Sequence, residues 1–106
     1  MDLKALSMLA TQVKDGYRSK GALEGEKAWS ASQYVLALAG DFGDLSKLIL
    51  KKEGFRISEA VDEKIAHELA DCLWCLLVLA DALSIDLETA YLQTMAELNE
   101  RISSND

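Results

Sequence analysis

Proline is absent from this chain of 106 residues, and aromatic side chains are few. Alanine and leucine are abundant instead, so the composition favours helices and offers little material for strands. Half of the residues are apolar, which argues against a disordered chain. We therefore expect an all-α fold in one domain spanning residues 1–106. A chain this short gains stability from oligomerisation.

Positive charge is also in short supply, because 18 acidic residues outnumber 11 lysines and arginines and the net charge is −7. Binding to a nucleic-acid backbone needs basic patches, so nucleic acid is not an expected partner. A polyanionic ligand would enter mainly together with cations. No basic-then-apolar leader opens the chain, and no apolar run approaches the roughly 20 residues of a membrane span. We expect a soluble, cytoplasmic protein that does not bind membranes.

The two cysteines, Cys72 and Cys75, have the spacing of a redox motif or of half a zinc site. A reactive thiol usually lies at an exposed helix N-terminus, and a zinc site needs two more ligands. Here both cysteines lie inside an apolar stretch. We interpret them as reduced, buried side chains that act as small hydrophobes. A redox role, or a zinc ion shared across a dimer, is the alternative.

Apolar residues at helical spacing predict a first helix over residues 2–18, ended by Gly16 and the polar residues that follow. A long polar loop then extends to Ser30, with Trp29 near its end. Loops of that length are often functional. A second helix is expected from about residue 32 to 52.

A third helix is expected over residues 59–83, after a connector in which Gly54 ends one helix and Ser58 caps the next. Residues 72–80 are apolar on every side, so this helix should be central or should face a partner subunit. Asp86 is expected to cap a fourth helix, which begins near Leu87 and frays at the C-terminus.

Four acidic residues repeat one spacing on the second and third expected helices. Asp41 and Asp44 are three residues apart, as are Glu68 and Asp71, so each pair lies on one helical face. An antiparallel hairpin with its midpoint at Arg56 would bring all four carboxylates to the same level. Glu68 and Asp71 also border the apolar run, where an unpaired carboxylate is costly to bury.

Such a cluster needs compensation, since two like charges 4 Å apart repel by about 4 kcal/mol at an effective dielectric constant of 20. Protonation, lysines or metal ions would provide it. Carboxylate oxygens without histidine or cysteine suit Mg²⁺ or Mn²⁺ rather than zinc, and magnesium in an acidic pocket usually meets phosphate. The alternative is that the four acids are solvated surface residues.

Gly40 and Gly43 lie beside the first acidic pair, and each costs about 1 kcal/mol relative to alanine inside a helix. They indicate either close helix packing or close approach of a ligand. Packing is the simpler of these two explanations.

The stretches LAGDFGDLSKLIL and HELADCLWCLLVLADALSIDLETAY resemble the MazG-like all-α nucleoside triphosphate pyrophosphohydrolases over residues 29–101. That family carries Glu-x-x-Glu on one helix and Glu-x-x-Asp on the next. The resemblance implies a four-helix bundle assembled as a homodimer or a dimer of dimers. It also implies Mg²⁺-dependent cleavage of a nucleoside triphosphate at the α–β linkage, which releases a monophosphate and pyrophosphate.

By position, Asp41, Asp44, Glu68 and Asp71 take the places of the metal-binding and catalytic acids of that family. The two aspartates are shorter than the usual glutamates, and Gly40 stands where many members have a further glutamate. Thr94 and Leu98 stand where many members have a lysine and an asparagine for the phosphates, whereas Arg101 matches a common arginine.

Other residues are candidates for binding the substrate. Lys47 and Lys64 each share a helical face with an acid and could bind phosphate, although surface ion pairs would explain them equally well. Trp29 could stack on a base or simply anchor the second helix. His67 points about 100° away from Glu68 around the helix, so a surface position is expected.

Two other functions remain open at the level of sequence. The chain could be a helical dimerisation or regulatory module that has kept the scaffold and lost the chemistry. It could also hydrolyse another phosphoanhydride, such as phosphoribosyl-ATP. The base and sugar of a nucleotide substrate cannot be predicted.

Overall fold

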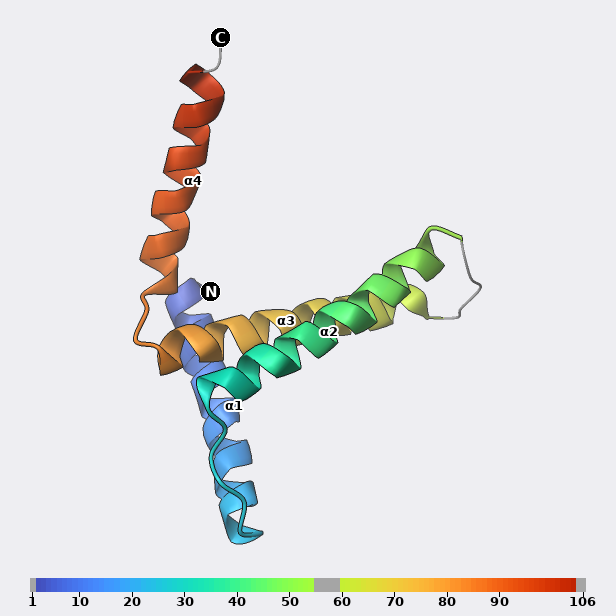
Figure 1. Cartoon of the computed structure of the whole chain (residues 1–106), viewed down its shortest axis with the longest axis vertical. Coiled ribbons are helices and arrows are strands. Elements are labelled where there is room, and N and C mark those ends of the chain that lie inside the picture. The colour runs from blue at the N-terminus through green and yellow to red at the C-terminus, as the bar shows by residue number, and fades with distance from the viewer. Residues whose placement is uncertain (1, 55–59, 105–106) are drawn as a thin grey trace.

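The chain folds into helices connected by short loops (Figure 1). A computed structural model describes residues 2–54 and 60–104, and within them there are four helices and no strand. The helices are α1 (Leu3–Leu23), α2 (Ala31–Lys52), α3 (Val61–Ala82) and α4 (Leu87–Ser104). The prediction of an all-α fold is confirmed. None of these helices has both the length and the apolarity needed to span a membrane.

Helix α1 is longer than predicted, since it continues to Leu23 instead of ending near residue 18. Gly16 lies inside the helix, where one glycine costs only about 1 kcal/mol and does not stop propagation. The turn comes later, at Gly25, whose φ of 81° lies in the left-handed region. The predicted long loop is therefore reduced to residues 24–30.

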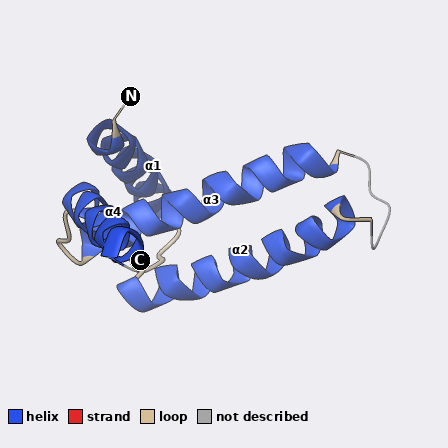
Figure 2. Ribbon diagram, turned by 90° about the horizontal axis from the view of Figure 1, so that it is seen from above, coloured by secondary structure: helices blue, strands red, loops and turns tan. Residues whose placement is uncertain are grey.

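Helices α2 and α3 form an antiparallel hairpin and run side by side (Figures 1 and 2). Their bounds lie within two residues of the prediction. Gly54, with φ of 91°, follows the end of α2 as expected for a helix-terminating glycine. The predicted cap Ser58 and the predicted hairpin midpoint Arg56 lie outside the described residues.

The hydrophobic core lies where α1, the start of α2 and the end of α3 meet. Val78 is fully buried there, and its buried neighbours in the core are Ala10, Tyr34 and Leu77. The indole Nε1 of Trp74 donates a hydrogen bond to the carbonyl oxygen of Ala10 at 3.2 Å, which ties α3 to α1. The prediction that α3 is central is confirmed, because it packs against both α1 and α2.

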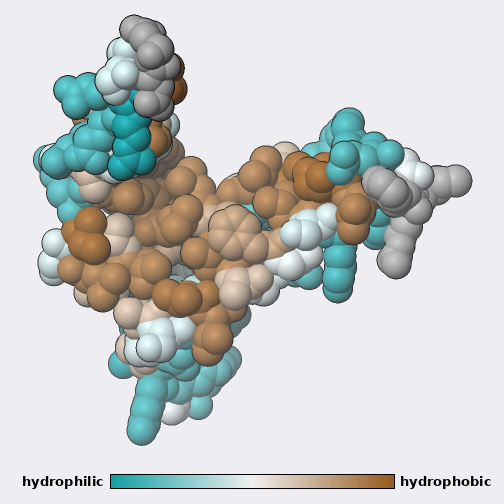
Figure 3. All heavy atoms as spheres, turned by 45° about the horizontal axis from the view of Figure 1, so that its top comes forward, coloured by the Kyte–Doolittle hydropathy of each residue, from teal (hydrophilic) through white to brown (hydrophobic). Residues whose placement is uncertain are grey.

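Helix α4 is the least integrated element of the chain. Asp86 caps it as predicted, since Asp86 Oδ1 accepts a hydrogen bond from the backbone N–H of Thr89 at 3.1 Å. Leu87 packs against the core, but α4 has no buried residue and projects away from the α2–α3 hairpin (Figure 1). Apolar side chains cover much of the face shown in Figure 3. Apolar residues that are strongly exposed in the chain include Leu36, Leu92 and Ile102.

Candidate metal centre

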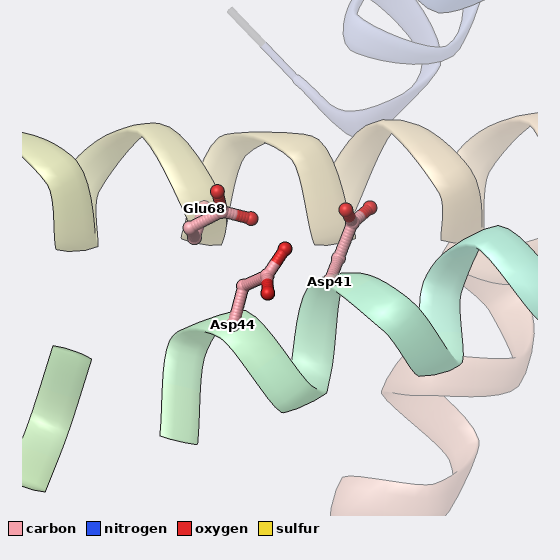
Figure 4. Close-up of side chains that lie close together, drawn as sticks. All are labelled: Asp41, Asp44 and Glu68. Atoms are coloured by element: carbon pink, nitrogen blue, oxygen red, sulfur yellow. The ribbon is translucent and has the colours of Figure 1, made fainter. Parts of the chain in front are cut away.

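Three carboxylates from two helices converge between α2 and α3 (Figure 4). Asp41 and Asp44 come from successive turns of α2, and Glu68 faces them from α3. Each contributes one oxygen, and these oxygens all lie within 4.8 Å of one another. Among the described residues, no lysine or arginine nitrogen lies within 4.0 Å of them. The helical repeat thus brings together like charges with no ion-pair partner among residues 2–54 and 60–104.

Glu68 is the most constrained member of this carboxylate cluster. Its Oε2 atom is buried and has no hydrogen-bond partner among the described residues. Burial raises the pKa of Glu68, and the negative charges of Asp41, Asp44 and Asp71 raise it further, against a smaller opposing effect of His67. A buried carboxylate oxygen without a partner is costly, so this position favours a proton or a cation.

Asp71 does not belong to the carboxylate cluster, although its position in the sequence placed it at the same level. Its Oδ2 lies 3.2 Å from Nε2 of His67, four residues earlier on α3, and its side chain is 43% exposed. A carboxylate of Asp71 that contacts His67 does not point to the oxygens of the other three acids. The expectation of a surface position for His67 is confirmed, since its side chain is 73% exposed.

Gly40 and Gly43 do not serve close helix packing within the described part of the chain. A Cβ atom built on either glycine would have no neighbour within 4 Å. Close helix packing among the described residues therefore does not explain the two glycines. The glycines instead leave open space on α2 beside Asp41 and Asp44.

An open groove of about 390 Å³ extends from the carboxylate cluster toward the end of α2 and the start of α3. Both lysines singled out from the sequence, Lys47 and Lys64, line it together with Asp44 and Glu68. The remaining lining residues are Leu48, Lys51, Glu63 and His67. Lys51 was not singled out, although it lies seven residues after Asp44 and so returns to the same helical face.

The two cysteines are buried, free thiols, as the interpretation from the sequence requires. Burial, followed by the neighbouring charge of Asp41, raises the pKa of Cys75 to about 11. A thiol with so high a pKa is protonated at neutral pH, which disfavours a nucleophilic or redox role. Cys75 Sγ also donates a weak hydrogen bond to Oδ2 of Asp41, at 3.7 Å. Cys75 lies seven residues, or two helical turns, after Glu68 and so returns to the helical face that meets Asp41; this spacing was a signal for the contact.

The other two candidate substrate residues lie away from the groove. Trp29 precedes α2, and its ring packs edge-on against Tyr34 with centroids 5.3 Å apart, while the residue stays 52% exposed. These contacts agree with an anchor for α2. Arg101 is exposed near the end of α4, the helix that projects away from the hairpin. Neither residue lines the groove within one chain.

The donor set fits a small divalent cation. All three convergent groups are carboxylates, and hard oxygen donors of this kind suit Mg²⁺ or Mn²⁺. An ion at this position would give the unpaired oxygen of Glu68 a partner and offset the repulsion between Asp41 and Asp44.

Comparisons with protein-family models, with curated proteins and with solved structures found no match to this chain.

Proposed function

We propose that this chain is a Mg²⁺-dependent hydrolase that converts a nucleoside triphosphate into a monophosphate and pyrophosphate, in the manner of the MazG-like enzymes it resembles. Mn²⁺ is the second candidate ion. The observation that carries the proposal is the convergence of Asp41, Asp44 and Glu68, with a buried and unpaired oxygen on Glu68. The groove that opens from this cluster offers room for a phosphate chain.

The residues divide the chemistry between them. A bound divalent ion supplies charge neutralisation for the phosphates and a lowered pKa for a water ligand. Asp41, Asp44 and Glu68 would hold the ion, and Asp71, which contacts His67, would lie beside them as a further carboxylate. Whichever of Asp41 and Asp44 is not fully engaged takes the proton of the attacking water. The water oxygen bonds to phosphorus at the α–β linkage, and the bond from that phosphorus to the bridging oxygen breaks.

The proposal includes a four-helix bundle that assembles as a homodimer or a dimer of dimers. Helix α4 buries no residue and exposes Tyr91, Leu92 and Ile102. Most helices in proteins are stabilised by packing of an apolar face, so a second copy is the natural partner for this surface. Arg101 would then reach a groove from a neighbouring subunit. A cytoplasmic location, as expected from the sequence, belongs to the same proposal.

The test is a screen of nucleoside triphosphates with separate detection of pyrophosphate and orthophosphate. Wild-type protein should release pyrophosphate only when Mg²⁺ or Mn²⁺ is present. Glu68→Gln should abolish turnover while circular dichroism shows unchanged helicity. Glu97→Gln makes the same substitution on exposed α4 and should retain activity. Retained turnover in Glu68→Gln, or orthophosphate as the first product, would contradict the proposal.

A helical dimerisation or regulatory module is the second candidate, and the exposed apolar surface of α4 favours it. The short side chains of Asp41 and Asp44, in place of glutamates, point the same way. Titration with Mg²⁺ separates the two functions, because an active site should bind the ion and raise the melting temperature. A protein that dimerises but does not respond to either ion is such a module. Including phosphoribosyl-ATP in the screen tests the third possibility.

A further inference from the structure

The groove beside the carboxylate cluster has cations at one end only. On α2, Asp44 is followed on the same side by Lys47 and Lys51, and on the antiparallel α3, Lys64 precedes Glu68. All three lysines therefore lie between the acids and the end of the hairpin where α2 stops and α3 starts (Figure 2).

The side of the carboxylate cluster away from the lysines has a different character. One turn before Asp41, α2 carries Ala37 and Leu38, both partly buried, and one turn after Asp71, α3 carries the buried Cys75. A phosphate chain that extends in that direction would leave its charge against apolar side chains, which is unfavourable. The two sides of the carboxylate cluster are thus chemically distinct, one lined by the lysines of the groove and the other by apolar side chains.

Charge in the groove depends on whether ions are bound. Four carboxylates, from the three-residue cluster and Glu63, face three ammonium groups in and beside the groove, so the metal-free site carries a small negative charge. Divalent ions at the carboxylate cluster make it positive. In a chain with a net charge of −7, this is a place where a polyanion is attracted instead of repelled.

Lys51 stands apart from the other two lysines. Lys47 and Lys64 lie one helical turn from the nearest acid of the cluster, about 5 Å along the axis, whereas Lys51 lies two turns from Asp44, about 10 Å. Lys51 is partly buried although it is charged, and no carboxylate of the described residues lies within 4.0 Å of its ammonium group. Its neighbour Lys52 is exposed and forms an ion pair with Asp62.

We propose that the groove holds the phosphate chain in one direction, with the terminal phosphates against Lys47, Lys51 and Lys64, and that Lys51 distinguishes three phosphates from two. This inference rests on the proposed function. The ions hold the phosphates at the scissile linkage, Lys47 and Lys64 neutralise the next phosphate, and only a third phosphate extends to the level of Lys51. The nucleoside then lies on the side of the carboxylate cluster opposite to the lysines.

Calorimetry with uncleavable nucleotides tests this inference without turnover. The probes are the α,β-methylene analogues of nucleoside triphosphates and diphosphates with each of the four RNA bases, in excess Mg²⁺. Lys51→Gln should weaken binding of the triphosphate analogue by about tenfold and leave the diphosphate analogue nearly unchanged, because one charge-assisted contact is lost. Lys52→Gln removes the same charge from the adjacent position and should change neither affinity.

The inference would be overturned if Lys51→Gln lost the same affinity for both analogues or lost none for either. It would also be overturned if the wild-type protein bound neither analogue. These outcomes are separable from those of the proposed function, which is read from release of pyrophosphate by the wild type and its loss in Glu68→Gln. An active enzyme indifferent to Lys51→Gln refutes only the direction of binding. Selective triphosphate binding without hydrolysis refutes only the catalytic proposal.

Discussion

The two halves of α3 are stabilised in opposite ways. Residues 72–82, the apolar half, contain every buried residue of this helix. Trp74 in this half packs edge-on against Tyr34 of α2, and α3 also packs against α1. Residues 61–71, the charged half, bury no residue fully and place Glu68 against Asp41 and Asp44 across the hairpin. One half is held by hydrophobic burial, while the other half contains charges that oppose folding. Sites that bind ligands are often found in the less stable part of a fold.

The largest change in stability is expected when a carboxylate is introduced into the apolar half of α3. Val78 is fully buried, so Val78→Asp leaves a carboxylate without a partner in the core and should cost about 3 to 5 kcal/mol of unfolding free energy. Glu68→Gln removes a charge from the opposite half and should stabilise the metal-free protein. Urea titrations followed by circular dichroism measure both changes. Destabilisation of the metal-free protein by Glu68→Gln would show that the carboxylate cluster is not repulsive.

Magnesium should distinguish the halves by their hydrogen exchange. At a concentration about 100 times its dissociation constant, an ion that binds only the folded state adds about 2.7 kcal/mol of stability. Backbone amides of residues 61–71 and 41–51 should therefore exchange more slowly in Mg²⁺. The amides of residues 75–80 lie in the core and exchange mainly through global unfolding, so they should gain the full stabilisation, whereas amides that open locally without releasing the ion should gain less. Unchanged exchange of residues 75–80 in Mg²⁺, measured by mass spectrometry, would contradict this expectation.

The pH dependence of stability should reveal the ionisation of Glu68 in the charged half of α3. Burial and neighbouring carboxylates raise the pKa of Glu68 above that of the unfolded chain, so the ionised form opposes folding. The penalty is present above the folded-state pKa and is relieved as the pH falls through it toward the unfolded value. Without metal, the stability difference between Glu68→Gln and wild type should be largest near neutral pH and should shrink on acidification. Thermal melts across that range, with and without Mg²⁺, measure it.

The smallest effect is expected at the boundary between the halves, where Cys75 donates a hydrogen bond to Asp41. Cys75→Ala should weaken Mg²⁺ binding by about threefold to tenfold, since a net hydrogen bond contributes on the order of 1 kcal/mol. Cys72→Ala removes an equally buried thiol that makes no such bond within the described residues, and it should change only stability. Equal Mg²⁺ affinities in the two variants, measured by calorimetry, would exclude a positioning role for Cys75.

Local patterns in the sequence were sufficient to predict the four helices. The 3.6-residue repeat of apolar side chains predicted α2, α3 and α4 within about two residues, and the cap at Asp86 was predicted as well. The end of α1 was missed, because a single glycine such as Gly16 stops a helix only when the residues after it also disfavour one. Those residues include alanine, leucine and lysine, which are good helix formers.

The pairing of acids was predictable in part. The shared spacing of Asp41–Asp44 and Glu68–Asp71, with a hairpin between them, predicted carboxylates at one level, and three of the four converge. The contact between His67 and Asp71 is local, since the two residues are four apart on α3, and this spacing was a signal for it. Lys51 and Cys75 were missed although each lies seven residues after an acid of the cluster and so returns to the same helical face.

By itself, then, the sequence determined what depends on neighbours along the chain: helical segments, their caps, the apolar stretch of α3 and the acidic faces of α2 and α3. Contacts between helices were decided only by tertiary structure. They left α4 without buried residues and opened space beside Gly40 and Gly43. They also brought Glu68 to Asp41 and Asp44 and grouped three lysines at one end of a groove. The physical reason is that helical periodicity specifies the direction of a side chain around its own axis, whereas the packing of one helix on another specifies what that side chain meets.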